Sequence, residues 1–139
     1  MVDKTLLAAK VAAIRDAVQR IRAVLPLDRE TFISDRTARE IVTLNLFVAL
    51  QECLSLATHW LADEGWDIPQ SYRDVLRTLG EREVIPRELA ARLASASGLR
   101  NLIAHQYGVL DWARIHQIAL TALDDLLAFC EALARRASS

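Results

Sequence analysis

The sequence has little of what breaks or cross-links a chain: its 139 residues include 4 Gly, 3 Pro and 2 Cys. So few Gly and Pro residues exclude a turn-rich β protein, and two cysteines are too few for a disulfide scaffold. Cys53 and Cys130 lie far apart among apolar neighbours, so we predict two reduced thiols buried in the core. Because the apolar residues are mostly Ala and Leu, we predict an all-α protein.

The chain also lacks a strong charge of either sign. Its 17 Lys and Arg residues against 18 Asp and Glu residues give a formal net charge of −1. This balance excludes a protein that coats nucleic acid through bulk positive charge. A local cluster of arginines, for example Arg73, Arg77 and Arg114, could still bind RNA beside a site. The length and the 53% hydrophobic content predict a single folded domain over residues 1–139.

Several motifs of metal, nucleotide and membrane proteins are missing. His59, His105 and His116 show neither H-E-x-x-H spacing nor a neighbouring Cys pair, and no Walker or G-x-G-x-x-G loop is present. We therefore expect no metal site and no cofactor. The N-terminus has no signal-peptide core, and no uncharged apolar run reaches the ~20 residues that cross a bilayer. A soluble, cytoplasmic protein without a membrane partner is expected.

Apolar residues recur at steps of three or four in five segments, which predicts a bundle of four long helices and one short helix. The long helices are predicted from about Asp3 to Leu25, from Arg36 to Asp63, from Pro86 to His105 or Tyr107, and from Asp111 to about Leu133, with the short one from Ser71 to Leu79. The segment from Leu27 to Ile33 is predicted to be a connection. Gly65, Gly80 and Gly108 are predicted to end the helices before them.

The helix predicted from Arg36 to Asp63 is apolar on almost every face. Such a helix needs cover on all sides, and the other helices of so short a chain cannot easily supply it, so we predict a homodimer. A thin polar stripe on this helix contains Asn45, Glu52, Ser55 and His59. The stripe is either a partly solvated or hydrogen-bonded strip, or it directs Glu52 into a functional cleft.

Four polar residues gather within eight positions at the end of a predicted helix: Arg100, Asn101, His105 and Tyr107. Asn101 and His105 are four residues apart and share a face, so the amide could orient the imidazole. An imidazole exchanges protons near neutral pH, and a guanidinium fits a phosphate. Together they could cleave RNA without a metal, by moving the 2′-hydroxyl proton, protonating the leaving oxygen and stabilising the phosphorane.

Geometry restricts how these residues could act together. On one straight helix Arg100 and His105 point about 140° apart and cannot both reach one substrate atom. Either the last turn is distorted, or a second subunit supplies its own copy across a symmetric interface. A purely structural role is the other reading, in which His105 caps carbonyls, Arg100 is solvated and Tyr107 covers the helix end.

The pattern Arg100-Asn101-x-x-x-His105-x-Tyr107 resembles the R-N-x-x-x-H-x-Y signature of the HEPN superfamily, in particular of HepT toxins that pair with MNT-type nucleotidyltransferase antitoxins. The likeness extends over most of the chain and includes Ser34-Asp35, Leu50-Gln51-Glu52-Cys53, and Ile68 to Arg73 ahead of Leu79-Gly80. The chain departs from the family at Ser97-Gly98, where a bulkier residue is usual and where the turn would be looser.

This resemblance implies an HEPN-like fold and a toxin that cleaves tRNA or mRNA as a metal-independent endoribonuclease. It implies a homodimer with a shared cleft, in which Arg100 and His105 are catalytic and Asn101 is their orienting partner. It also implies that an MNT antitoxin neutralises the toxin by AMPylation of Tyr107, since an adenylated phenol adds bulk and negative charge beside Arg100. Glu52 is a candidate supporting residue that would pair with Arg100 or help to position His105.

Two other functions remain open from the sequence. The chain could be a non-catalytic subunit that binds substrate for a partner nucleotidyltransferase, or a structural dimerisation module without a ligand. A binding subunit would use Arg100 for phosphate contact but would not need an ionisable His105 beside it. A dimerisation module would need neither residue, so the motif favours the ribonuclease.

Overall fold

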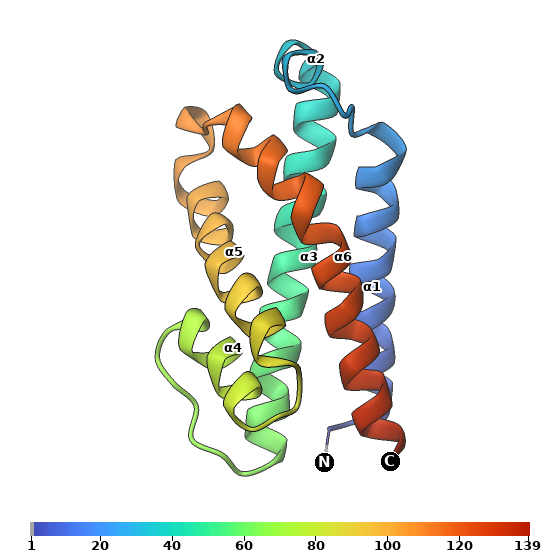
Figure 1. The fold of residues 1–139 in the computed structure, drawn as a ribbon, viewed down its shortest axis with the longest axis vertical. Coiled ribbons are helices and arrows are strands. Elements are labelled where there is room, and N and C mark those ends of the chain that lie inside the picture. The colour runs from blue at the N-terminus through green and yellow to red at the C-terminus, as the bar shows by residue number, and fades with distance from the viewer. Residues whose placement is uncertain (1) are drawn as a thin grey trace.

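The computed structural model describes residues 2–139, and within that range the chain forms six α-helices and one 3₁₀ helix but no strand. The elements are α1 Lys4–Val24, α2 Arg29–Ser34, α3 Arg36–Asp63, α4 Tyr72–Glu81, α5 Arg87–Gln106, η1 Tyr107–Val109 and α6 Trp112–Ser138. The predicted all-α bundle is therefore confirmed. Figure 1 shows α1, α3 and α6 running along the long axis, with α4 and α5 beside them.

The structure has one helix more than the apolar pattern predicts. α2 occupies most of the segment from Leu27 to Ile33, for which we predict only a connection. The Asp28 carboxylate caps it by accepting a hydrogen bond from the Thr31 N–H at 2.9 Å. Its Phe32 is fully buried, and the Phe32 and His116 ring centroids are 5.3 Å apart. A helix of 6 residues is too short for periodicity to reveal it, so the bundle has two short helices rather than one.

Three helices begin where the sequence places a capping side chain. Asp35, Ser71 and Asp111 each accept a hydrogen bond from the backbone N–H three residues later, at 3.0, 3.1 and 3.3 Å. These bonds satisfy backbone donors that have no partner inside the helix. α3 begins and ends where predicted, at Arg36 and Asp63.

The glycine predictions are confirmed at one position and wrong at two. Gly65 ends α3 in the left-handed conformation, with φ +74°. Gly80 instead lies buried inside α4, and the left-handed residue after that helix is Glu83, with φ 60°. Gly108 lies in η1 without a positive φ, so it forms no left-handed cap.

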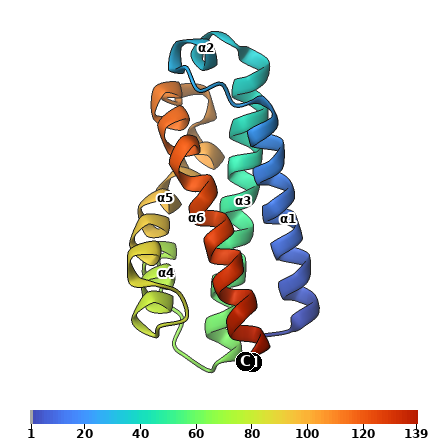
Figure 2. The same ribbon diagram turned by 45° about the vertical axis from the view of Figure 1, so that its right-hand side comes forward.

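α3 is the central helix, because it packs against α1, α2, α4, α5 and α6. Figure 2 shows it behind α6, with α1 on one side and α5 on the other. Among the described residues, only α3 is long and apolar enough to cross a bilayer by length and composition, and half of its most apolar stretch is buried in the bundle. The chain itself thus supplies more of the cover than we predict, although Leu44 is 61% exposed.

Both cysteines are free and buried, as predicted. Cys53 lies on α3 and Cys130 on α6. Burial raises the pKa of the Cys53 thiol well above its usual range, with a smaller effect of Cys130. Burial also raises the pKa of Cys130, to about 11. Both thiols therefore stay protonated at neutral pH.

Candidate active site

The four motif residues lie on the second half of α5 and just beyond its end. Arg100 and Asn101 are inside the helix, and His105 is in its last turn. At Gln106 the backbone leaves the helical region, with φ −135° and ψ 34°, and Tyr107 begins η1. Because this break follows His105, it redirects Tyr107 but leaves Arg100 and His105 about 140° apart around the helix. A single protomer therefore does not aim both side chains at one point.

Arg100 is held by groups from three helices. Its Nε donates a hydrogen bond to Gln51 Oε1 on α3 at 2.7 Å, and its Nη1 donates to Asn101 Oδ1 at 2.9 Å. The central guanidinium carbon lies 5.6 Å from the ring centroid of Phe47 on α3 and 5.8 Å from that of Tyr72 on α4. Two amide oxygens and two aromatic rings thus fix the guanidinium.

The positive charge of Arg100 has no carboxylate partner among residues 2–139. Other arginines on the same bundle are paired. Arg22 on α1 contacts Asp124 on α6 at 2.6 Å, and Arg92 on α5 contacts Asp125 on α6 at 3.1 Å. Arg100 therefore combines a fixed position with an uncompensated charge, which suits a group that receives an external phosphate.

Glu52, our predicted supporting residue, pairs with Lys10 of α1 instead of Arg100. Lys10 Nζ lies 2.9 Å from Glu52 Oε2, and both side chains are partly buried. The neighbouring Gln51 takes the contact with Arg100. Successive positions on a helix differ by about 100°, so Gln51 faces α5 while Glu52 faces α1. In the sequence, the charged Glu52 is a more obvious candidate partner of Arg100 than Gln51. Only the orientation of α3 in the structure shows that Gln51 is that partner.

Asn101 and His105 are not brought together. The Asn101 amide oxygen accepts its hydrogen bond from Arg100, although the sequence spacing predicts that the amide orients His105. His105 is exposed, and within residues 2–139 no side chain is hydrogen-bonded to its imidazole. The imidazole is thus open to solvent, to a substrate or to another protein chain.

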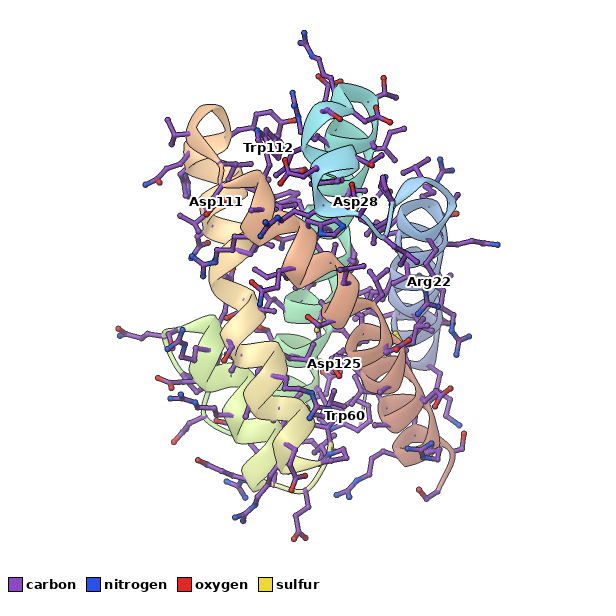
Figure 3. The ribbon with its side chains drawn as sticks, turned by 45° about the horizontal axis from the view of Figure 1, so that its top comes forward. Arg22, Asp28, Trp60, Asp111, Trp112 and Asp125 are labelled. Carbon is purple, nitrogen blue, oxygen red and sulfur yellow. The ribbon has the colours of Figure 1, made fainter. Side chains whose placement is uncertain are left out.

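Tyr107 is 46% exposed and packs against the first residue of α6. The Tyr107 and Trp112 rings meet edge to face, with centroids 6.2 Å apart. The Arg39 guanidinium of α3 lies 5.0 Å from the Trp112 ring centroid, and its Nη1 donates to the Ile33 carbonyl. Figure 3 labels Trp112 at the end of the bundle where α3 and α6 begin. Two helices thus support the position of the tyrosine.

A groove of about 430 Å³ runs between α3 and α5 beside the tyrosine. It is lined by Glu40, Leu44, Phe47, Ile103, Ala104 and Tyr107. Phe47 also lies against the Arg100 guanidinium, so the groove connects the surroundings of Tyr107 with those of Arg100. At its edge, the hydrogen bond and charge of Glu40 raise the pKa of Arg36, with a smaller effect of Tyr107. The lining of the groove is thus mostly apolar, with Glu40 as its charged member.

The other arginines that could bind RNA are dispersed over the bundle. Arg73 follows Tyr72 on α4, and Arg77 contacts Asp74 at 3.8 Å, whereas Arg114 lies on α6 and shares a pocket with Arg92 and Asp125. The three arginines therefore do not form one cluster on the same element. In the described part of the chain, no three His, Cys, Asp or Glu side chains gather as metal ligands.

The comparison with known sequences identifies a family. Residues 14–133 match the family described as "Ribonuclease HepT-like". The chain is 30% identical over 124 residues to the mRNA nuclease HepT of Shewanella oneidensis, covering 89% of this chain and 92% of that protein.

Solved structures share the fold along nearly the whole chain. The tri-AMPylated Shewanella oneidensis HEPN toxin in complex with its MNT antitoxin is 29% identical, with a TM-score of 0.84 and coverage of 97% of this chain and 99% of that one. A toxin–antitoxin complex with AMP-PNP is 27% identical, with a TM-score of 0.85 and coverage of 94% and 98%. Since the family match spans residues 14–133 and the fold agrees over the same range, this protein belongs to the HepT-like ribonuclease family of the HEPN superfamily.

Proposed function

We propose that this protein is the toxin of a toxin–antitoxin module and cleaves RNA at a site built from Arg100 and His105. The observation that carries this function is Arg100, which is fixed by neutral groups and has no carboxylate partner in the part of the chain that the structure describes. The mRNA nuclease HepT of Shewanella oneidensis, 30% identical to this chain, makes mRNA the substrate class to test first. Because RNA is the substrate, the cytoplasm is the expected place of action.

The proposed reaction uses the 2′-hydroxyl of the substrate as its nucleophile. One imidazole takes the proton of this hydroxyl as its oxygen attacks the adjacent phosphorus, and the bond from phosphorus to the 5′ oxygen breaks. A second imidazole gives a proton to the departing oxygen. The Arg100 guanidinium stabilises the negative charge that develops on the phosphorane. DNA lacks the 2′-hydroxyl and is therefore not cleaved by this route.

Two protomers are needed for this reaction, because one helix does not aim Arg100 and His105 at the same point. A twofold axis would bring the Arg100 and His105 of one copy opposite those of the other. Part of the apolar lining of the groove is open to solvent, since Leu44, which lines it together with Phe47, is 61% exposed. This exposed apolar surface supports an interface on this face. Asn101 then acts as a partner of Arg100 rather than of the imidazole.

Neutralisation is proposed to occur at Tyr107, by AMPylation catalysed by a cognate MNT nucleotidyltransferase antitoxin. The tri-AMPylated relative bound to its MNT antitoxin supports this step. The Tyr107 side chain is exposed, and the groove beside it leads to Phe47 and Arg100. An attached AMP would add a phosphate charge and a bulky base in this groove, opposing both RNA and the approach of a second copy.

The test is expression of the wild type, Arg100→Ala and His105→Ala without antitoxin, followed by an RNA cleavage assay in the presence of EDTA. We expect toxicity and cleavage that survive chelation in the wild type, and a loss of about 100-fold or more in each variant. Arg92→Ala is the matched control, because Arg92 is an exposed arginine on the same helix that pairs with Asp125. Equal inactivity of the wild type and His105→Ala would instead favour the substrate-binding subunit.

A further inference from the structure

We propose that Gln51 is a positioning residue for Arg100, which it fixes in place without cancelling the charge. This inference rests on the proposed function, in which Arg100 receives the phosphate of RNA. Gln51 Oε1 accepts the Arg100 Nε–H at 2.7 Å in a partly buried setting. Because the guanidinium is planar, a bond at Nε together with one at Nη1 sets the orientation of the whole group.

This arrangement leaves donors free for a substrate. A guanidinium carries five N–H donors, and the two hydrogen bonds to Gln51 and Asn101 use two of them. The remaining donors lie on the Nη atoms, which form the fork that matches two phosphate oxygens. Gln51 therefore holds Arg100 from the side that a phosphate does not need.

The other neighbours of Arg100 also leave its charge intact. Phe47 and Tyr72 attract the cation through their ring faces, and neither carries a formal charge. Glu52, the acid next to Gln51 in the sequence, pairs with Lys10 at 2.9 Å. Lys10 thus neutralises the carboxylate that follows Gln51 in the sequence. The surroundings of Arg100 consist of neutral acceptors and aromatic rings.

Two substitutions of Gln51 separate its effect on the position of the Arg100 guanidinium from an effect on the charge of that group. Gln51→Glu keeps the length and shape of the side chain but places a carboxylate against the Arg100 Nε. The resulting ion pair would hold the guanidinium at least as firmly while competing with a phosphate for it. Gln51→Met does the opposite, because it removes the acceptor and adds no charge. Weaker RNA binding by Gln51→Glu at equal or higher stability would therefore indicate a positioning role. A merely structural role would not produce this combination.

The experiment compares the wild type, Gln51→Glu, Gln51→Met and Arg100→Ala, with Gln19→Glu as a charge-matched control. Gln19 is exposed on α1, which does not pack against α5 among the described residues. Binding is measured with a 2′-O-methyl oligoribonucleotide over a series of salt concentrations, because this probe has no free 2′-hydroxyl and cannot be cleaved by the proposed route. Cleavage of the matching RNA gives kcat and KM, and thermal unfolding gives Tm.

We expect Gln51→Glu to bind the probe about tenfold more weakly and to raise KM more than it lowers kcat. Its logarithmic salt slope should be shallower by about 0.7 per protomer, because one phosphate contact is lost. Its Tm should equal or exceed that of the wild type. Gln51→Met should keep the wild-type salt slope and lower kcat, and Gln19→Glu should behave like the wild type.

The outcomes separate this inference from the proposed function. If Arg100→Ala weakens binding while Gln51→Glu binds with the wild-type affinity and salt slope, the positioning role is overturned and the ribonuclease stands. If binding of the probe is weakened by both Arg100→Ala and Gln51→Glu but the wild type cleaves no RNA, the positioning role is supported and the catalytic proposal fails. If Arg100→Ala binds and cleaves like the wild type, both are overturned.

Discussion

Tyr107 and Trp112 meet edge to face, with their ring planes at 79° and their centroids 6.2 Å apart. The two residues lie on either side of the turn that joins α5 to α6, and Arg39 of α3 lies against the tryptophan. The backbone break at Gln106 frees Tyr107 from α5. The position of the tyrosine ring therefore depends on the contact with α6, which α3 supports, as well as on the end of α5.

Replacing Trp112 with alanine should slow AMPylation of Tyr107 by the antitoxin. An aromatic pair of this kind contributes about 0.5–1.5 kcal/mol, so a fall of about two- to tenfold in the modification rate is expected. The rate is measured by mass spectrometry of the toxin after incubation with antitoxin and ATP. Trp112→Phe keeps an aromatic edge and should modify at close to the wild-type rate. Modification of Trp112→Ala at the wild-type rate would show that the contact does not position the tyrosine.

Tyr107→Phe should remain an active toxin that the antitoxin no longer neutralises. The change removes only the hydroxyl that would carry AMP and keeps the ring that packs against Trp112. Growth and RNA integrity are followed with and without co-expressed antitoxin, and the mass of the toxin is recorded. A Tyr107→Phe protein that is still silenced and still gains AMP would place the modification at a different residue.

Two glycines should respond to alanine in opposite directions. A Cβ on Gly80 would lie 2.7 Å from the Ala90 Cβ, so Gly80→Ala should push α4 and α5 apart and destabilise the fold by about 1–2 kcal/mol. A Cβ on Gly98 would meet nothing within 4 Å, so Gly98→Ala should stabilise α5 by up to about 1 kcal/mol through helix propensity. Urea unfolding of the two variants beside the wild type measures both changes. Equal shifts of the same sign would contradict the packing at Gly80.

Alkaline pH should destabilise the protein partly through Cys130. The folded state raises the pKa of this thiol from 9.0 to about 11, so the unfolded chain loses the proton first. The stabilisation is complete below the unfolded pKa, begins to fall near pH 9 and is lost as the pH passes the folded value. Between pH 9 and 10 this group alone should lower the free energy of unfolding by about 1 kcal/mol.

Cys130→Ala is the comparison. Between pH 9 and 10 its free energy of unfolding should fall by about 1 kcal/mol less than that of the wild type. Urea unfolding at pH 8, 9 and 10 measures the difference between the two slopes. The variant will itself be less stable at every pH because it leaves a small cavity, so only the slope is diagnostic. Parallel slopes would show that Cys130 titrates alike in both states.

Much of the fold could be predicted because long amphipathic segments and capping residues carry local information. Asp35, Ser71 and Asp111 each begin a helix in the structure, as their short polar side chains predict. α2 could not be predicted in this way, because a short helix with one cap and one buried phenylalanine shows no repeating pattern of apolar residues. Gly80 is predicted wrongly for a related reason: its role is close approach to Ala90 of α5, and the residues next to Gly80 in the sequence do not encode which helix packs against α4.

The candidate site could be predicted as a set of residues but not as a set of contacts. Arg100, Asn101, His105 and Tyr107 stand together in the sequence, within the residues 14–133 that match the family. Which side chain touches Arg100 depends on the rotation of α3 and the approach of α4, and no local pattern encodes either. Gln51 and Tyr72 therefore come from the structure alone. The homodimer and the roles of the four motif residues stay predictions.

The start of α1 and the end of α6 lie at the same end of the bundle, whereas η1 and the start of α6 lie at the opposite end (Figure 1). An affinity handle, a fluorescent reporter or a surface linker attached at either end of this chain would thus be held away from Tyr107. Single-molecule and immobilised binding assays can be built on that geometry, with the end of the bundle that carries Tyr107 facing the solution.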